Sequence, residues 1–264
     1  MAKAGAIRIG VGGWTYAPWR GTFYPKGLAH KDELAHAGRT MSALEINGTF
    51  YRSQRPETFA KWRGEVPDGF VFTVKAPRYA TNRKVLADAG ESVERFVFGG
   101  LTELGDALGP ILWQLPETKR YDEADFAAFL ALLPDSAGGR RLRHAVELRH
   151  DSFRVPEVVA LARRAGVAIV WARDSRHPEI ADLCADFAYV RLLGTREDEA
   201  KGYDEAALDR HAESLAALAR GTAPSPACLA EPAARGAREV FAFVIGGHKA
   251  ANPAAATSLI ERLG

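Results

Sequence analysis

Eight short apolar segments recur along the chain, separated by segments whose apolar residues repeat with helical spacing. Short apolar runs bounded by polar or turn residues are typical of buried strands. The pattern predicts strands over residues 7–11, 43–46, 70–74, 111–113, 145–148, 167–171, 187–192 and 240–245. Apolar residues one helical turn apart predict helices over 126–133, 155–165, 208–218 and 256–263, with weaker helical stretches over 31–37, 57–65, 91–108 and 178–185.

Strands that alternate with helices form parallel βαβ units. Eight such pairs within 264 residues match a TIM-like (β/α)₈ barrel, and we expect one α/β domain over residues 1–264. A doubly wound open sheet remains an alternative, because eight alternations alone do not exclude it.

Almost every predicted strand leads into a polar or charged residue at its C-terminal end. In a parallel barrel these ends meet at one face, where such folds keep their chemistry. We therefore expect a site at this mouth, built from the side chains that follow the eight strands: Trp14, Asn47, Lys75, Gln114, Arg149, Asp174, Arg191 and His248.

Composition is that of a soluble globular protein, with 47% hydrophobic and 26% charged residues. No stretch approaches the roughly 20 apolar residues that span a bilayer, so no membrane partner is expected. Residues 1–10 lack the apolar core of a signal peptide, which favours a cytoplasmic location. The two cysteines, Cys184 and Cys228, are far apart and predict neither a disulfide framework nor a cysteine zinc site.

The net charge of +2 is unevenly distributed. Residues 1–86 carry 14 Lys and Arg against 6 Asp and Glu, a net +8, whereas residues 87–264 carry 21 against 27, a net −6. If the basic third borders the mouth, it favours an anionic small molecule or a nucleic acid as ligand. A solvated basic surface without a ligand is the alternative.

Two carboxylates and one lysine are the candidates for catalysis. Strand alternation places Glu45 and Asn47 on one side of their strand and Glu147 and Arg149 on one side of another. A carboxylate inside a barrel must be paired or hydrogen-bonded, so Glu45 and Glu147 are either proton-transfer groups or members of ion pairs. Lys75 ends its strand facing the mouth, where it suits anion binding or, if desolvated, nucleophilic chemistry.

The remaining candidates would bind the ligand. Trp14 and Tyr16 belong to an aromatic loop after the first strand, in which most aromatic residues are expected to form a hydrophobic plug. His150 titrates near neutrality and is a candidate proton carrier or ligand. The full set of predicted ligand-binding residues is Trp14, Tyr16, Asn47, Thr49, Tyr51, Gln114, Arg149, His150, Asp174, Arg191 and His248.

No cofactor follows from the sequence. We find no HExxH, Walker lysine, GxSxG or recognised zinc spacing. The five residues Glu45, Glu147, Asp174, His150 and His248 would supply a carboxylate-rich Mg²⁺ or Mn²⁺ site if the fold brought them together.

Taken together, these motifs resemble the domain of unknown function 72, or YecE-like, family. The resemblance covers almost the whole chain and implies a single TIM-like barrel without a settled activity. The residues that carry it are Gly12-Gly13-Trp14-x-Tyr16-x-x-Trp19-x-Gly21-x-Phe23-Tyr24-Pro25, Glu45-x-Asn47-x-Thr49-Phe50-Tyr51, Phe72-x-Val74-Lys75-Ala76-Pro77, Gln114-Leu115-Pro116 and Glu147-x-Arg149-His150-x-Ser152.

The chain departs from the family pattern at three mouth positions. The family usually has a histidine where this chain has Asn82 and another where it has Leu193, and an asparagine-rich end of the last strand where this chain has Gly246. Chemistry that needs those side chains would be changed here, with His248 as a partial substitute.

The sequence therefore predicts an enzyme that acts on an anionic, phosphorylated or nucleotide-like ligand at the C-terminal mouth, with a phosphoesterase or nuclease-like hydrolase as the most concrete version. The alternative is a non-catalytic module that binds nucleic acid or a small molecule. A third hypothesis is a structural barrel in which Glu147–Arg149 and Glu45–Lys75 ion pairs only stabilise the mouth.

Overall fold

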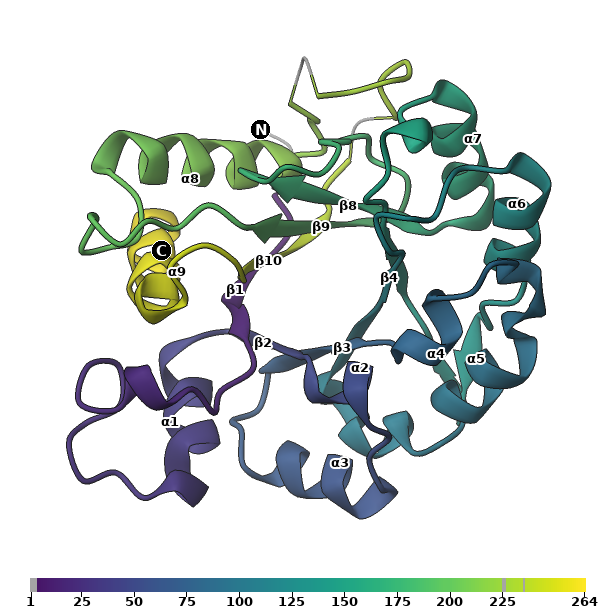
Figure 1. Cartoon of the computed structure of the whole chain (residues 1–264). Helices are drawn as coiled ribbons and strands as arrows, with labels where there is room; N and C mark the ends of the chain where they lie inside the picture. Colours follow the sequence, from purple (N-terminus) through teal and green to yellow (C-terminus); the bar gives the residue numbers. More distant parts are fainter. Residues whose placement is uncertain (1–3, 225–226, 235) are drawn as a thin grey trace.

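Eight parallel strands close into one barrel, surrounded by helices (Figure 1). The computed structural model describes residues 4–224, 227–234 and 236–264. Around the barrel the strand order is β1-β10-β9-β8-β7-β4-β3-β2, which confirms the predicted barrel and excludes an open sheet. Each predicted strand overlaps one of the observed strands, which are β1 (Ile7–Gly12), β2 (Ala43–Ile46), β3 (Val71–Lys75), β4 (Leu108–Gln114), β7 (His144–Glu147), β8 (Ala168–Arg173), β9 (Phe187–Leu192) and β10 (Glu239–Val244).

The helices pack outside the barrel, and their ends follow local sequence signals. Helix α8 begins after Asp204, whose carboxylate accepts a hydrogen bond from the backbone N–H of Ala207. Helix α7 ends at Gly166, which adopts a positive φ of 63°. The α-helices are α1 (Glu33–Thr40), α2 (Gly48–Tyr51), α3 (Pro56–Gly64), α4 (Arg78–Thr81), α5 (Gly90–Val97), α6 (Glu123–Ala131), α7 (Pro156–Ala165), α8 (Glu205–Ala219) and α9 (Asn252–Leu263).

Short 3₁₀ turns and one small hairpin complete the secondary structure. The weak helical stretch at 91–108 divides into α5 and the 3₁₀ segment η4 (Leu101–Ala107). The other 3₁₀ turns are η1 (Ala17–Trp19), η2 (His30–Asp32), η3 (Leu86–Ala89), η5 (Asp151–Phe153) and η6 (Lys249–Ala251), and the hairpin pairs β5 (Ser136–Ala137) with β6 (Arg140–Arg141). Among the described residues, no helix is both long enough and apolar enough to cross a membrane.

The predicted helix at 178–185 is wrong. This segment connects β8 to β9 and has no helical residues. Its backbone is held instead by a distant segment, because the Asp182 carboxylate accepts hydrogen bonds from the backbone N–H groups of Leu229 and Ala230. The N–H of Ala181 likewise donates to the carbonyl of Ala227. These long-range bonds replace the local ones that a helix would need.

Side chains inside the barrel change from apolar to polar toward the C-terminal ends of the strands. On β2 the inward-facing position changes from Ala43 to Glu45, and on β7 it changes from Ala145 to Glu147. Because alternate residues of a strand share a face, one apolar layer supports a polar layer directly above it. The apolar layer consists of Ala43, Val71, Leu112, Ala145, Ala168, Val170, Phe187, Tyr189, Phe241 and Phe243.

Candidate active site

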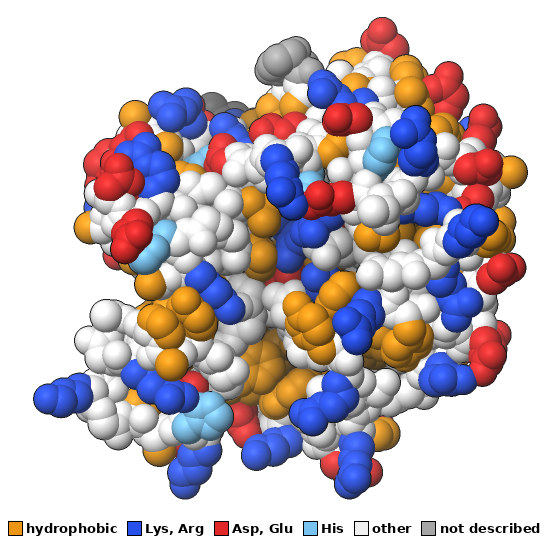
Figure 2. Space-filling view, viewed as in Figure 1, with side chains coloured by type: hydrophobic (Ala, Val, Ile, Leu, Met, Phe, Trp, Pro, Cys, Tyr) orange, Lys and Arg blue, Asp and Glu red, His pale blue; other side chains and the backbone are white. Residues whose placement is uncertain are grey.

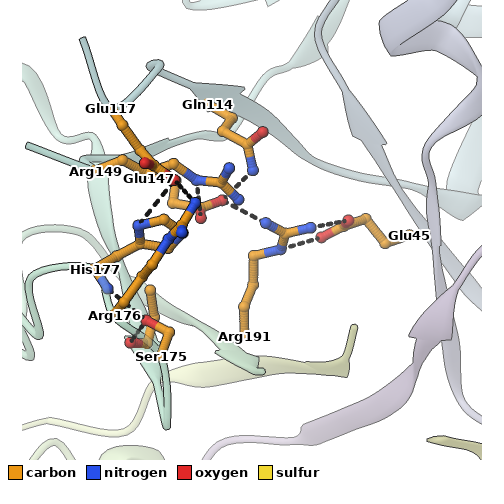
Figure 3. A network of polar contacts seen from close by, with 10 residues as sticks. Glu45, Gln114, Glu117, Glu147, Arg149, Ser175, Arg176, His177 and Arg191 are labelled. Atoms are coloured by element: carbon orange, nitrogen blue, oxygen red, sulfur yellow. Dashed lines mark hydrogen bonds and ion pairs between the residues drawn. The ribbon is translucent and has the colours of Figure 1, made fainter. Parts of the chain in front are cut away.

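The floor of the barrel mouth is a buried ion-pair network centred on Arg191 of β9 (Figure 3). Its Nη2 lies 2.9 Å from Oε1 of Glu45 and its Nε lies 3.2 Å from Oε2 of the same carboxylate. Its Nη1 donates to Oε2 of Glu147. The Arg191 side chain is 2% exposed and both carboxylates are fully buried. One guanidinium therefore joins two strands from different parts of the barrel.

The hydroxyl of Tyr189 adds a further hydrogen bond to the Glu45 carboxylate. The hydroxyl of Tyr189 donates to Oε2 of Glu45 at 2.7 Å, and Thr73 Oγ1 lies 2.9 Å from that hydroxyl. Burial and the Glu45 charge raise the pKa of Tyr189 well above its usual value, so the hydroxyl keeps its proton. The bonds from Tyr189 and Arg191 hold the Glu45 carboxylate in one orientation.

Glu147 is held by three side chains. Besides Arg191, Nε2 of Gln114 lies 2.7 Å from its Oε2 and Nε of Arg149 lies 2.8 Å from its Oε1. Burial by itself would raise the pKa of Glu147, but the charges of Arg191 and Arg149 outweigh burial and lower the pKa to about 2. Glu147 is therefore ionised at neutral pH, and the Glu147–Arg149 ion pair predicted from the sequence is confirmed.

Above this floor lies an open cavity of about 700 Å³. The space-filling view shows a central hollow whose edges carry basic and hydrophobic side chains (Figure 2). Eight of the predicted site residues line it: Trp14, Tyr16, Asn47, Tyr51, Lys75, Gln114, Arg149 and Arg191. The other lining residues are Gly12, Gly13, Thr15, Gly48, Phe50, Asn82, Pro116, Glu117, Ile245 and Lys249.

Lys75, the last residue of β3, has an unusual environment for a lysine. Its side chain lines the cavity although the residue is only 8% exposed, and its Nζ lies 3.9 Å from the centre of the Phe50 ring. Among the described residues it forms no ion pair and its Nζ donates no hydrogen bond, so the predicted Glu45–Lys75 ion pair is absent and Glu45 binds Arg191 instead. Burial, followed by the charge of Arg191, lowers the pKa of Lys75 to about 8.

Several other polar groups face the cavity with unused hydrogen-bonding capacity. Within the described part of the chain, Nη1 and Nη2 of Arg149 have no acceptor, because only its Nε binds Glu147. Oε1 of Gln114 is similarly free, since its Nε2 carries the bond to Glu147. The side chains of Asn47 and Asn82 also border this space. Together these groups offer several donors and at least one acceptor to a ligand.

Aromatic rings form the walls of the cavity. Trp14 packs edge-on against Trp62 at 5.1 Å between ring centres, which fixes its orientation. After the neighbouring strand β2, Phe50 and Tyr51 are in edge-on contact at 5.1 Å, and Tyr51 is 71% exposed. The plug predicted beneath the first loop is confirmed, because Trp19 and Tyr24 are fully buried.

Besides the floor carboxylates Glu45 and Glu147, four predicted site residues do not line this cavity. Thr49 is buried beneath it, where Oγ1 donates to the backbone carbonyl of Lys75 at 2.7 Å. His150 caps η5 by accepting a hydrogen bond from the backbone N–H of Ser152. Asp174 lies with its Oδ2 3.1 Å from Nε2 of His211, and His248 lines a separate cavity beside α9. None of these four side chains lines the mouth.

The proposed carboxylate-rich metal site is not formed. Glu45 and Glu147 are occupied by Arg191, while Asp174, His150 and His248 lie in separate places. In residues 4–224, 227–234 and 236–264, no three His, Cys, Asp or Glu side chains come together in a group that could hold a metal ion. The metal hypothesis fails because Arg191 pairs with the two carboxylates that it needs as ligands, and the other three side chains lie elsewhere.

An outer pair of charges borders the mouth above Arg149 (Figure 3). Glu117 lines the cavity and lies 2.7 Å from Nη2 of Arg176, a residue of the loop after β8. Nδ1 of His177 lies 3.8 Å from the same Glu117 oxygen. Burial, together with the charge of Arg149, lowers the pKa of His177. The Glu117–Arg176 ion pair at the rim is well exposed, whereas the ion pairs of the floor are buried.

A family model described as "Protein of unknown function DUF72" matches residues 8–264. The chain belongs to the DUF72 family. The relative "UPF0759 protein YecE" from Escherichia coli K12 is 28% identical over 147 residues, which are 56% of this chain and 50% of that protein. The aligned part therefore spans only about half the length of the curated relative.

Solved structures of DUF72 proteins show the same fold. A DUF72 family protein (TM1631) from Thermotoga maritima has a TM-score of 0.74 and 20% identity, with 98% of each chain covered. One from Enterococcus faecalis (EF0366) has a TM-score of 0.69 and 16% identity, with each chain covered in full. A D-psicose 3-epimerase has a TM-score of 0.52 and 12% identity, over 94% of this chain and 89% of that one. At these identities the likeness concerns the fold alone.

The three departures from the DUF72 pattern lie differently with respect to the mouth. Asn82 lines the cavity, so a polar amide stands there. Leu193 and Gly246 follow β9 and β10 and are in close contact, since a Cβ on Gly246 would lie 2.8 Å from the carbonyl oxygen of Leu193. Leu193 and Gly246 therefore lie where the segments after β9 and β10 pack against each other.

The predicted site set omits five polar or aromatic residues that line this DUF72 mouth, namely Thr15, Phe50, Asn82, Glu117 and Lys249, although the family resemblance had already placed Asn82 at the mouth. Phe50 was visible in the Glu45–Tyr51 motif, and its place one residue from Tyr51 was the available signal. Lys249 follows β10 and lies with Nζ 4.5 Å from the centre of the Tyr16 ring, a contact that no local pattern predicts. Asn82 and Glu117 belong to loops whose paths depend on packing.

Proposed function

We propose that the mouth of this protein is the active site of an enzyme that acts on a phosphorylated or nucleotide-like organic anion. One observation carries the proposal: Lys75 and Arg149 both present N–H donors to the same cavity, and these donors have no partner among the described residues. Cations that converge on a concave, partly desolvated site attract an anion strongly.

The charges of the floor support this assignment. Arg191 already neutralises part of the Glu45 and Glu147 charge, so the two carboxylates repel an incoming anion less than free carboxylates would. The cations Lys75, Arg149, Arg191 and Lys249 line the cavity, and Glu117, which is paired with Arg176, is the one carboxylate among the lining residues. The lining therefore has a net positive charge.

Each group of lining residues has a distinct role in this proposal. Arg149 binds the phosphate or carboxylate with its two free amino groups. Asn47 and Gln114 orient the ligand through their amides, and Trp14 and Tyr16 pack against its planar or apolar part. Glu45 and Glu147 keep Arg191 and Arg149 in place, and proton transfer falls to Lys75.

Lys75 suits proton transfer because its pKa of about 8 lies near the operating pH. In the most concrete version, phosphoester hydrolysis, the neutral amine accepts a proton from the attacking water. The guanidinium of Arg149 then stabilises the negative charge on the phosphoryl oxygens. Turnover in this version requires both side chains.

The test measures binding and turnover separately. Nucleoside monophosphates, sugar phosphates and a short oligonucleotide are titrated calorimetrically, and release of inorganic phosphate or of a nucleoside is followed. We expect Arg149→Met to weaken anion binding at least tenfold, since a charge-assisted hydrogen bond contributes about 1.5–3 kcal/mol. Arg154→Met is the matched control, because Arg154 is an exposed arginine five residues along the chain.

The outcomes distinguish an enzyme from a binding module. Binding that Arg149→Met weakens, with turnover that Lys75→Met abolishes, supports the enzyme. Binding without turnover of any phosphoester, falling steeply with salt, would instead assign a non-catalytic anion-binding module. Affinity that is equal in the wild type and in Arg149→Met would contradict the proposed site.

A further inference from the structure

The amine of Lys75 faces the cavity and, within the described residues, has neither an ion-pair partner nor a hydrogen-bond acceptor. Among the described residues its Nζ contacts the ring of Phe50 at 3.9 Å and donates no hydrogen bond. The hydroxyl of Thr49 donates to the Lys75 carbonyl at 2.7 Å and so fixes the end of β3. The amine is therefore held at the cavity wall with its outer side open to a ligand.

A lysine can act as a nucleophile only in its neutral form. Burial and neighbouring cations are the two devices that proteins use to favour that form, and both act on Lys75. The guanidinium groups of Arg191 and Arg149 are the neighbouring cations. With a pKa of about 8 instead of 10.5, the neutral fraction at pH 7 is on the order of a hundredfold greater than for an exposed lysine.

We propose that Lys75 forms an imine with the carbonyl carbon of its ligand, so that the substrate of this mouth is an organic anion bearing an aldehyde or ketone group. The inference rests on the anion site of the proposed function, because Arg149 must hold the anionic end while Lys75 reaches the carbonyl. Lys75 here acts as a nucleophile, in place of its role as proton acceptor in the phosphoester version. The cavity of about 700 Å³ accommodates a small organic anion of this kind.

The step balances without an oxidant or a reductant. The neutral amine of Lys75 attacks the carbonyl carbon, a C–N bond forms, and the carbonyl oxygen gains a proton to give a carbinolamine. The C–O bond then breaks, the oxygen leaves as one molecule of water that carries both former amine protons, and the C–N single bond becomes a C=N double bond. A proton from solvent then gives the protonated imine. The protonated imine withdraws electrons from the adjacent carbon, as a Schiff base does in lysine-dependent enzymes.

The proposed imine chemistry explains why Lys75 has no carboxylate partner in the part of the chain that the structure describes. A structural lysine in a buried site would be paired, because an unpaired buried ammonium is costly. Glu45 lies in the layer below Lys75, yet both of its oxygens bind Arg191. The charges of Glu45 and Glu147 both favour the ammonium form of Lys75, but both carboxylates are paired with Arg191, and burial with the Arg191 charge outweighs them.

The experiment compares two anions that differ in one carbonyl group. Dihydroxyacetone phosphate has a ketone, and glycerol 3-phosphate has a hydroxyl at the same place. Each is incubated with the whole protein and sodium borohydride, which reduces an imine to a stable amine. Peptide mass spectrometry then locates the adduct, with the exposed Lys31 as the internal control.

We expect dihydroxyacetone phosphate to label Lys75 and to leave Lys31 unlabelled. Glycerol 3-phosphate should give no adduct, but it should compete with labelling. Lys75→Arg keeps the positive charge without a nucleophilic amine, so it should bind glycerol 3-phosphate and give no adduct. Arg149→Met should reduce both binding and labelling at least tenfold.

Two results separate the failure of this inference from the failure of the proposed function. Glycerol 3-phosphate binding that depends on Arg149, with no borohydride adduct at Lys75 from dihydroxyacetone phosphate, overturns the imine and leaves the anion site intact. Adducts spread equally over Lys75 and exposed lysines also overturn it. If neither phosphate binds and no adduct forms, both proposals fail together.

Discussion

Arg191 on β9 and Glu45 on β2 form a two-point ion pair although 146 residues separate them in the sequence. The Nη2–Oε1 and Nε–Oε2 distances are 2.9 and 3.2 Å, and both side chains are buried. Because Arg191 also binds Glu147 of β7, this guanidinium joins three strands of the barrel. Arg191 thereby fixes the two carboxylates beneath the cavity that Lys75 and Arg149 line.

Removal of Arg191 should destabilise the protein strongly. Arg191→Met leaves Glu45 and Glu147 buried without their main counter-charge, and breaking a buried pair in this way costs about 3–5 kcal/mol. We expect a loss of this size in the free energy of unfolding, measured by urea denaturation. The exposed Arg154→Met should change it by less than about 0.5 kcal/mol.

A triple variant tests whether the pairing itself is stabilising. Combining Glu45→Met, Glu147→Met and Arg191→Met removes all three buried charges together, so we expect it to be more stable than Arg191→Met alone. If the triple variant is less stable than Arg191→Met, the ion-pair network contributes more to the free energy of unfolding than the compensation of buried charge.

Glu147 should make stability dependent on acid. Its pKa is about 2 in the folded protein against 4.5 for an ordinary glutamate, so the folded state binds this proton less readily than the unfolded state. The stabilisation is fully present above pH 4.5 and is lost as the pH falls toward 2. Glu147→Gln should therefore reduce the slope of unfolding free energy against pH in this window. An unchanged slope would assign the acid sensitivity to other carboxylates.

The strands were predictable from sequence because they are buried on both faces. Continuous apolar runs such as 167–171 are typical of strands that are covered on both faces. Alternation along a strand also predicted that Glu147 and Arg149 share a side, which the 2.8 Å ion pair confirms. Local sequence thus placed these two side chains on the same face of the chain.

The partners of those side chains were not predictable. Glu45 pairs with Arg191 rather than with Lys75, because closure of the barrel brings the two side chains together across its interior. No local signal in the sequence gives that distance. The helix expected at 178–185 failed for the same reason, since Asp182 binds the backbone at 229–230. Long-range packing decided both outcomes.

Lys75 should reduce the stability of the protein at neutral pH. Its pKa falls from 10.5 to about 8 on folding, so the folded state binds its proton less well and stability rises as the pH increases from 8 to 10.5. Lys75→Met removes the buried ammonium and should raise the unfolding free energy at pH 7 by about 1–3 kcal/mol. Measured by urea denaturation, this gain should shrink toward pH 10.5. A loss of stability at pH 7 would contradict the unpaired environment of Lys75.

Phe50 should regulate the protonation of Lys75 through its ring. The ammonium lies 3.9 Å from the ring centre, and such a cation–π contact stabilises the charged form by about 0.5–2 kcal/mol. Phe50→Leu should therefore lower the pKa of Lys75 by roughly half a unit to one unit. The pH dependence of Lys75 acylation, followed by peptide mass spectrometry, measures this shift. Tyr51→Leu is the matched control, because Tyr51 is the adjacent aromatic residue and is 71% exposed. Equal acylation profiles for Phe50→Leu and Tyr51→Leu would show that the Phe50 ring does not favour the ammonium form.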